Sequence, residues 1–417
     1  MSETPERTSP LHLFEGYGIE LEYMIVDRKT LAVLPICDQV LAALAGGEPV
    51  NEVSLGRINV SNELVLHVLE FKCNGPQADL SRMQRSFQEQ IRRVNQLLEQ
   101  RWNAQLLPTA MHPLMQPLAE TKLWPHGQQK IYQTYDRIFN CKGHGWSNLQ
   151  SVHINLPFAD DAEFGRLHAA IRLVLPLLPG LAASSPLVEG KITGKADNRL
   201  DFYSQNQKRI ASIIGPIIPE RAFTEAAYEE KIFAPIKRDI APHDPEEVLE
   251  EEWLNSRGAI ARFERAAIEI RLLDIQESVT ADFAVISLVV SLVKSLCDEV
   301  WLPLAAQQEM DELKLRDVLL ASIVQGGEYR LEDPQLLACF KQTAPLSLNA
   351  LWTALASELI DRGYPARDFV EGIRELLKKG TLSSRLVRVL GAQPGREEII
   401  QRYKELGNCL ESGRIYG

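Results

Sequence analysis

The sequence predicts an α+β fold in which helices pack on the apolar face of one sheet and a helical part follows toward the C-terminus. Long spacers separate the strand-like segments, and several of these spacers have the apolar spacing of helices. After Thr280 the chain has helical character almost throughout. In this chain of 417 residues we expect residues 11–300 to form the sheet with its helices. Residues 301–417 are expected to form a helical part packed on that sheet domain, with packing on another subunit as the alternative.

Four segments are predicted to be strands. Three of them alternate apolar and polar side chains, as a strand with one buried face does. In the first segment, Ile19, Leu21 and Tyr23 point to one side, whereas Glu20 and Glu22 point to the other. The four predicted strands cover residues 18–26, about 64–71, 151–156 and 267–273.

Helices are predicted between and after these strands. Asp79 can cap a helix with a single apolar stripe, which is formed by Met83, Phe87, Ile91, Val94 and Leu98. Further helices are expected near residues 163–183, 281–301, 348–362 and 366–379. The acidic run from Glu246 to Glu252 is interpreted as the solvated face of a helix rather than as a site.

Composition argues against nucleic-acid and membrane partners. The net charge is -11 and the pI about 5.4, so the chain has no excess of Lys and Arg to bind anionic polymers or lipids. The most apolar window, residues 283–293, is too short to span a bilayer and is predicted to be a buried helix. The first ten residues are polar, which predicts a loose tail and no signal peptide. Six scattered cysteines are typical of reduced thiols, so we expect a cytoplasmic protein.

Three predicted strands carry ionisable or amide groups on the face opposite their apolar side chains. An ordinary wet sheet face would carry Lys, Thr, Ser and Gln. These three strands instead carry Glu20, Glu22, His153, Asn155, Glu269 and Arg271. Carboxylates on neighbouring strands repel unless a cation lies between them, and Glu63 and Glu70 add two more. Carboxylates with one imidazole suit Mg²⁺ or Mn²⁺ better than zinc. Each motif alone also fits a structural role, so the prediction depends on their occurring together.

The order of these motifs resembles that of the glutamate–cysteine ligases and their carboxylate–amine ligase relatives, which share the glutamine-synthetase catalytic fold. The resemblance covers about residues 18–277. It is carried by Gly18-Ile-Glu20-Leu-Glu22, Glu63 before Leu69-Glu70-Phe71, Thr109-Ala-Met-His112-Pro113, Val152-His153-Ile-Asn155-Leu-Pro157, the helix end at residues 177–186, and Ile268-Glu269-Ile-Arg271-Leu-Leu-Asp274. Two departures are visible. Lys72-Cys73-Asn74 stands where the family often has Thr and Pro, and residues 194–209 do not map onto the ligase substrate pockets.

The resemblance implies a curved, mainly antiparallel sheet that binds ATP and Mg²⁺ or Mn²⁺. It implies metal ligands at Glu20, Glu22, Glu63, Glu70, His153 and Glu269. Arg271 would contact the transferred phosphate beside Glu269, and both are expected to be catalytic. His112 and Asn155 would lie on the substrate or nucleotide side. Of Arg257, Arg262 and Arg265, we assign Arg262 to the nucleotide, with ordinary surface positions as the equal alternative for all three.

The implied reaction joins a carboxylate to an amine. ATP would convert the carboxylate into an acyl phosphate, which an amino-acid amine then attacks. The sequence has no G-x-S-x-G, Walker A or G-x-G-x-x-G motif, so ATP would be held by metals rather than by a glycine-rich loop. We expect a glutamate–cysteine ligase-like enzyme acting on small molecules. The alternatives are the same chemistry on another acid and amine, a non-catalytic nucleotide- or metabolite-binding member, and a metal hydrolase. The sequence does not specify the oligomeric state.

Overall fold

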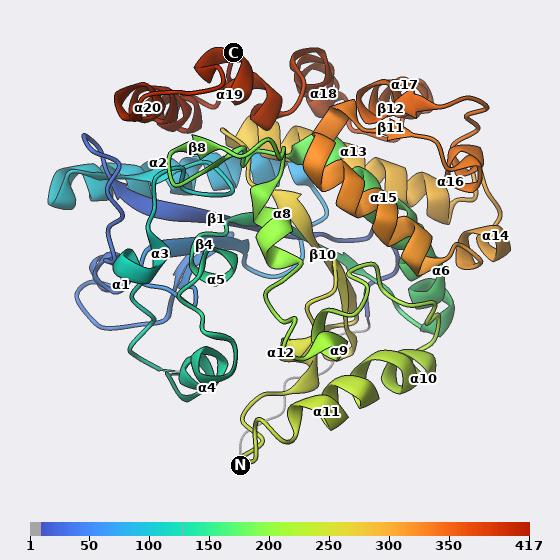
Figure 1. The fold of residues 1–417 in the computed structure, drawn as a ribbon, viewed down its shortest axis with the longest axis horizontal. Helices are drawn as coiled ribbons and strands as arrows, with labels where there is room; N and C mark the ends of the chain where they lie inside the picture. Colours follow the sequence, from blue (N-terminus) through green and yellow to red (C-terminus); the bar gives the residue numbers. More distant parts are fainter. Residues whose placement is uncertain (1–9, 128) are drawn as a thin grey trace.

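An eight-stranded antiparallel sheet forms the centre of the protein, for which we analysed a computed structural model (Figure 1). The structure describes residues 10–127 and 129–417, so the predicted N-terminal tail lies, apart from Pro10, outside the described residues. The strand order is β2-β3-β4-β1-β6-β10-β9, with β5 also paired to β1. The bounds are β1 Gly18–Asp27, β2 Glu52–Leu55, β3 Ile58–Asn62, β4 Val68–Cys73, β5 Ala104–Leu107, β6 Ser151–Pro157, β9 Ala259–Arg262 and β10 Ala267–Asp274.

The four predicted strands are confirmed as β1, β4, β6 and β10. The four others were not predicted, because each has only four or five residues and too few alternations to show a period. Gly56 has a φ of +82° in the two-residue turn that joins β2 to β3. This conformation is easy for glycine and fits a tight hairpin.

Helices cover the apolar face of the sheet. These are α2 (Leu80–Trp102), α6 (Asp161–Val174) and α13 (Val279–Cys297). Asp79 caps α2 as predicted, because its side chain accepts a 2.9 Å hydrogen bond from the Arg82 backbone N–H. The predicted apolar stripe of α2 is wholly buried. By length and composition α13 could cross a membrane, but 89% of its apolar window is buried inside the protein, as predicted for a core helix.

Two predicted helices differ from the structure. The helix expected at residues 163–183 ends at Val174 and continues as a 3-10 turn, η1 (Leu175–Leu177), and a short helix, α7 (Pro179–Ala182). Proline lacks an N–H and clashes with the preceding turn, which explains breaks at Pro176 and Pro179. The acidic run is helical only in α12 (Glu251–Leu254), so its interpretation as a helix face was wrong for the residues before it.

The C-terminal helices extend the same core. The predicted helices near 348–362 and 366–379 are confirmed as α17 (Leu348–Asp361) and α18 (Arg367–Lys379). Both pack on α13, and α15 (Glu312–Gln325) packs on α7. The helices α17 to α20 lie along one side of the molecule, at the top of Figure 1.

Two of these helices cover part of the second face of the sheet. Met24 and Val26 of β1 share a cluster of buried apolar side chains with residues of α19 (Leu382–Leu390) and α20 (Arg396–Ser412). Helices therefore lie on both faces at this end, whereas the sequence predicted one face only. Glu20 and Glu22 point to the same side as Met24 but outside that cover.

The remaining elements are short or peripheral. They are α1 Cys37–Leu44, α3 Pro117–Glu120, α4 Gln129–Phe139, α5 His144–Ser147, β7 Leu187–Val188, β8 Lys191–Ile192, α8 Asn198–Tyr203, α9 Ala211–Ile214, α10 Glu225–Tyr228, the π-helical η2 Glu229–Phe233, α11 Ala234–Ile240, η3 Phe263–Arg265, α14 Leu304–Gln308, η4 Gly326–Glu328, β11 Arg330–Leu331, α16 Pro334–Cys339 and β12 Leu346–Ser347.

Candidate active site

Five carboxylates gather on the polar face of the sheet, and we call them the acidic face: Glu20, Glu22, Glu63, Glu70 and Glu269. Residues paired across antiparallel strands point to the same side. The register pairs Glu20 with Lys72 and His153, and Glu22 with Glu70. It also pairs Glu269 with Asn155. The predicted common face of β1, β6 and β10 is therefore confirmed, and β4 shares it.

His153 lies at the centre of this arrangement. Its Nδ1 is 2.9 Å from Glu20 Oε2 and 3.7 Å from Glu269 Oε1. Its Nε2 is 3.0 Å from Ser151 Oγ and 3.9 Å from Glu22 Oε1. Burial alone would lower the pKa of His153, but its hydrogen bond to Glu20 and the charge of Glu22 raise that pKa above its usual value. The imidazole therefore lies within 4 Å of three carboxylates, those of Glu20, Glu22 and Glu269.

Glu20 has a second partner, because Asn155 Nδ2 donates a 3.0 Å hydrogen bond to its Oε1. Burial acts to raise the pKa of Glu20, but the hydrogen bond with His153 outweighs it and lowers the pKa to about 2. Glu22 accepts hydrogen bonds of 2.7 and 2.9 Å from the backbone N–H and hydroxyl of Ser151. Both carboxylates are therefore oriented by β6.

Two arginines hold Glu269. Arg262 Nε and Nη2 each lie 3.1 Å from Glu269 Oε2. Arg271 Nε lies 3.2 Å from Glu269 Oε1, as an ion pair without the angle of a hydrogen bond. Burial acts to raise the pKa of Glu269, but Arg271 and Arg262 together lower it. The guanidinium of Arg271 remains partly open, with 24% of its side chain exposed, and can donate to a ligand oxygen.

The opposite end of the acidic face contains a cation that sequence reasoning missed. Lys72 Nζ lies 3.0 Å from Glu70 Oε2 and 2.9 Å from Glu52 Oε2. Two causes raise the pKa of Glu70 to about 7: burial, which is the larger, and the negative charge of Glu20. The signal in the sequence was the spacing of Glu70 and Lys72, two residues apart on one strand and hence on one face.

Glu63 follows β3, and of the five carboxylates its negative charge is the least balanced by neighbouring groups. Burial and the neighbouring charges of Glu70 and Glu22 raise its pKa well above the usual value. Its Oε2 accepts a 3.4 Å contact from the Leu64 backbone N–H. Among the described contacts, no Lys or Arg lies within 4 Å of Glu63, Glu20 or Glu22, although the register places Lys72 opposite Glu20.

The donor types fit a divalent cation, but the side chains are not gathered into a finished coordination site. Carboxylates with one imidazole suit Mg²⁺. In the described parts of the chain, however, no three His, Cys, Asp or Glu side chains are arranged to hold one ion. Hydrogen bonds and ion pairs occupy His153, Glu70 and Glu269. Glu20 and Glu22 also accept hydrogen bonds from β6, so metal binding would require these side chains to reorient, and Glu63 has the weakest contacts of the five carboxylates.

Three of the predicted residues, His112, Arg257 and Arg265, have structural contacts or an exposed position away from the acidic face. His112 is buried, and its ring nitrogens contact the Leu31 carbonyl at 2.7 Å and the Leu114 N–H at 3.1 Å. Burial lowers its pKa to about 4. These contacts give His112 a structural role, and its predicted place on the substrate or nucleotide side stays a prediction. Arg257 forms a buried ion pair with Glu220, and Arg265 is exposed, so only Arg262 reaches the acidic face.

The unmapped segment 194–209 supports β10. Arg199, on α8, is buried, and its Nε lies 2.5 Å from Asp274 Oδ1 at the end of β10. Its Nη1 and Nη2 lie 3.4 and 3.5 Å from the carbonyl of Arg271. The hydroxyl of Tyr203 donates to the Ser256 carbonyl at 2.8 Å. This segment therefore fixes the backbone beside Arg271.

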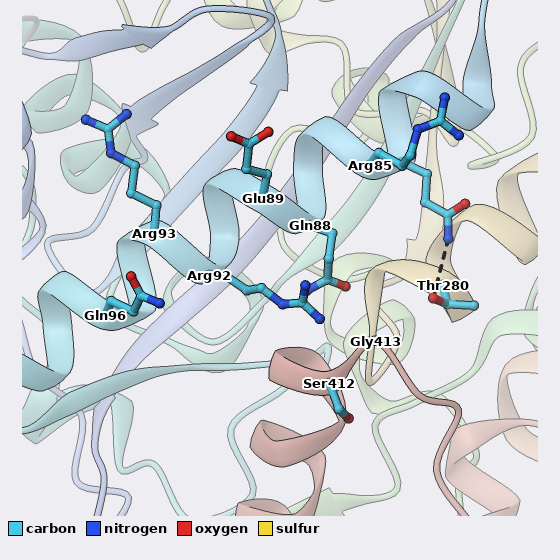
Figure 2. Close-up of a pocket in the computed structure, with 10 residues that line it drawn as sticks. Arg85, Gln88, Glu89, Arg92, Arg93, Gln96, Thr280, Ser412 and Gly413 are labelled. Carbon is cyan, nitrogen blue, oxygen red and sulfur yellow. Dashed lines mark hydrogen bonds between the residues drawn. The ribbon is translucent and has the colours of Figure 1, made fainter.

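A groove of about 660 Å³ lies away from the acidic face, along the outer side of α2 (Figure 2). Figure 2 shows Arg85, Arg92 and Arg93 extending from α2, with Ser412 and Gly413 of the C-terminal region beneath them. Since α2 packs on the apolar face of the sheet, this groove is on the opposite side from Glu20 and His153. No residue of the acidic face lines it.

Comparison with solved structures shows the class of fold. A glutamate–cysteine ligase of Francisella tularensis, solved in complex with AMP, matches with a TM-score of 0.59 at 12% identity, over 97% of this chain and 90% of that one. A bifunctional glutathione synthetase of Pasteurella multocida matches with a TM-score of 0.55 at 13% identity, over 95% of this chain and 52% of that one. The α+β sheet with its acidic face thus has the fold of glutamate–cysteine ligases, as predicted.

Sequence comparison then shows the family. The family model described as glutamate-cysteine ligase family 2 matches residues 17–405, so the chain belongs to that family. An uncharacterised protein of Archaeoglobus fulgidus is 34% identical over 96% of this chain and 99% of its own length. A provisionally named glutamate–cysteine ligase 2-3 of Rubrobacter xylanophilus is 27% identical over 45% of this chain and 47% of its own. Family membership points to a carboxylate–amine ligase.

Proposed function

We propose that this protein is an ATP-dependent ligase that activates a γ-carboxylate, such as that of glutamate, for attack by an amino-acid amine. The observation that carries the proposal is the pairing of Arg271 with Glu269 beside His153 and Glu20. A partly exposed guanidinium next to clustered carboxylates suits a phosphoryl group that is neutralised by cations. The AMP bound by the Francisella tularensis neighbour supports a nucleotide site on this fold.

Each side chain of the acidic face would have a separate role in this reaction. Arg271 donates to the oxygens of the γ-phosphoryl group, and Arg262 holds Glu269 so that its second oxygen faces the ligand side. Glu20, Glu22, Glu63, Glu70 and Glu269, with His153, would hold Mg²⁺ or Mn²⁺, and the metal would neutralise phosphate charge. Asn155 orients Glu20.

The reaction would proceed by two substitutions. An oxygen of the substrate carboxylate attacks the γ-phosphorus, and the bond to the ADP oxygen breaks, which gives an acyl phosphate and ADP. The amine nitrogen then attacks the acyl carbon. Phosphate leaves and the amine loses one proton, so the products are an amide, ADP and phosphate. Arg271 would stabilise the phosphate charge in both steps.

An assay of ADP release tests this proposal. Release should require both an acid and an amine, and a panel of amino acids and amines should identify the pair. The internal pairing of Glu70 and Glu269 with cations favours, as a second candidate, a non-catalytic member that binds a nucleotide or metabolite. Nucleotide binding without ADP release for any pair would support that second candidate. ADP release with no amine requirement would contradict both.

We also propose a cytoplasmic location and small molecules as the substrates. All six cysteines are free thiols, and five of them are buried, which fits a reducing compartment.

A further inference from the structure

The short helix α12 ends beside Arg262, and its last carbonyls accept hydrogen bonds from side chains of other elements. Such carbonyls have no partner within their own helix. The Glu252 carbonyl accepts a hydrogen bond from Nη1 of Arg262, the last residue of β9. The next carbonyl, that of Trp253, accepts a 2.8 Å hydrogen bond from the hydroxyl of Tyr135 on α4. Two adjacent carbonyls therefore connect α12 to β9 and to α4.

Arg262 contacts both α12 and the acidic face. Its Nε and Nη2 each lie 3.1 Å from Glu269 Oε2, while its Nη1 donates to the Glu252 carbonyl. Because a guanidinium group is planar and rigid, a shift of that carbonyl moves all of these donors together. The other oxygen of Glu269, Oε1, lies 3.2 Å from Arg271 Nε. The position of α12 therefore affects Arg271 through Arg262 and Glu269.

The ring of Tyr135 is held in place by neighbouring aromatic rings. Its centroid lies 5.9 Å from that of Phe139 and 5.8 Å from that of Trp146. Burial raises the pKa of Tyr135, and the charges of Arg271 and Arg262 act in the opposite direction. Tyr135 thus lies close to both guanidinium groups, and its hydroxyl stays protonated and able to donate.

We propose that Tyr135 is a positioning residue for the γ-phosphoryl group that Arg271 contacts, an inference that rests on the proposed function. The Tyr135 hydroxyl holds the end of α12, the end of α12 holds Arg262, and Arg262 holds Glu269 against Arg271. Without the hydroxyl, the aromatic ring still packs but the end of α12 can move. The guanidinium of Arg271 then keeps its charge and loses its orientation, so only the terminal phosphate of ATP is bound less well.

Nucleotide binding by Tyr135→Phe, which removes only the hydroxyl, tests the inference. Calorimetry with Mg²⁺ compares ADP with a non-hydrolysable ATP analogue, because the two differ in the γ-phosphoryl group. The variant should bind the analogue about 3- to 10-fold more weakly, the size of one hydrogen bond, and should bind ADP as the unaltered protein does. In steady-state ADP release, kcat should fall while KM for the acid and the amine stays unchanged. Equal weakening of both nucleotides, or no weakening of either, would overturn the inference.

A double-mutant cycle tests whether Tyr135 acts through Arg262. In Arg262→Gln the end of α12 has lost its guanidinium link to Glu269, so adding Tyr135→Phe should not weaken analogue binding further. Additive losses would show that Tyr135 acts independently of Arg262 and would overturn the inference. If Arg262→Gln does not fold, Arg262→Lys replaces it in the cycle, because an ammonium group lacks the planar donor fork that joins carbonyl to carboxylate.

Tyr364→Phe is the matched control, because the Tyr364 hydroxyl donates a 2.9 Å hydrogen bond to Asp298 at the end of α13, away from the acidic face. It should leave the affinities for ADP and for the analogue unchanged. The two results that contradict the role of Tyr135 leave the proposed function standing. Failure of the unaltered protein to bind either nucleotide with Mg²⁺ would overturn the proposed function and this inference with it.

Discussion

At the scale of single residues, His153 of β6 connects the acidic face by contacting Glu20 of β1 and Glu269 of β10. The alternation of β1, β6 and β10 in the sequence was enough to predict that Glu20, Glu22, His153, Asn155, Glu269 and Arg271 share one face. It could not predict their pairing, because pairing depends on cross-strand register. Lys72 and Glu52 were missed for this reason, and the contact of His112 with the Leu31 carbonyl was missed because its motif gives no information on its backbone partners.

The first prediction concerns the ion pair on β10. Glu269→Gln removes the ligand charge, and Arg271→Lys keeps the charge but loses the planar donor fork. We expect both variants to fold and to release ADP at least ~100-fold more slowly, as when one preorganised charge stabiliser is removed. Steady-state ADP release and thermal melts of each variant provide the measurement.

Glu250→Gln is the control for this prediction, because Glu250 is exposed outside the acidic face. Its turnover should be close to that of the unaltered protein. A surface ion pair would be worth only about 0–1 kcal/mol. Unchanged turnover in both Glu269→Gln and Arg271→Lys would therefore remove the main argument for a ligase.

The second prediction concerns divalent cations and ATP. Because Glu20, Glu22 and Glu63 lie together without a Lys or Arg partner in the described contacts, they should repel a triphosphate unless a cation is present. Calorimetry should show weak ATP binding in EDTA and much tighter binding with Mg²⁺ or Mn²⁺. Equal ATP affinity in both conditions would contradict a metal-dependent nucleotide site.

At the scale of secondary-structure elements, α8 shows how the unmapped segment supports the site. Long periodic elements such as α2 and β10 were predicted from their spacing, and the predicted strands and helices were largely confirmed. The short elements were not, because four to six residues contain too little periodicity. Nothing local in residues 194–209 shows that Arg199 contacts Asp274, which is 75 positions away in the sequence.

The third prediction belongs to this contact. Arg199→Met would leave the carboxylate of Asp274 buried without its guanidinium partner. Loss of one partner of a buried ion pair costs about 3–5 kcal/mol. We expect urea denaturation to show a decrease of this size in the free energy of unfolding.

Lys195→Met is the control within the same segment, because Lys195 pairs with Asp201 near the surface. It should change the free energy of unfolding by less than about 1 kcal/mol. Equal losses in Arg199→Met and Lys195→Met would indicate that burial of the Asp274 pair is not the cause.

At the scale of the whole molecule, one apolar core includes residues from both sides of residue 300. Phe283 of α13 stacks near Phe369 of α18, with ring centroids 6.4 Å apart. Trp352 of α17 donates a 2.9 Å hydrogen bond to the carbonyl of Leu177. The helical part after residue 300 was predicted from periodicity, but its coverage of the second face beside β1 was not, since α19 and α20 contact strands from the other end of the sequence.

The fourth prediction follows from this shared core. A chain ending at Trp301 would expose the apolar face of α13 and lose the cover over Met24 and Val26. We expect it to be insoluble or to retain far-UV but lose near-UV circular dichroism and to bind ANS. A truncated chain with cooperative melting and full activity would instead show that the C-terminal helices are an independent module.

The cover of α19 and α20 over one half of β1 also bears on how this strand finds its alignment during folding. A slip of β1 by two residues keeps every side chain on its own face, so the in–out pattern alone does not oppose it. Such a slip would move Glu22 into the place of Met24, beneath Leu382, Leu386 and Tyr403. An unpaired carboxylate among apolar side chains is strongly unfavourable. The docking of the last two helices therefore favours the observed alignment of the first strand over a slip of two residues, so segments from the two ends of the sequence stabilise one register.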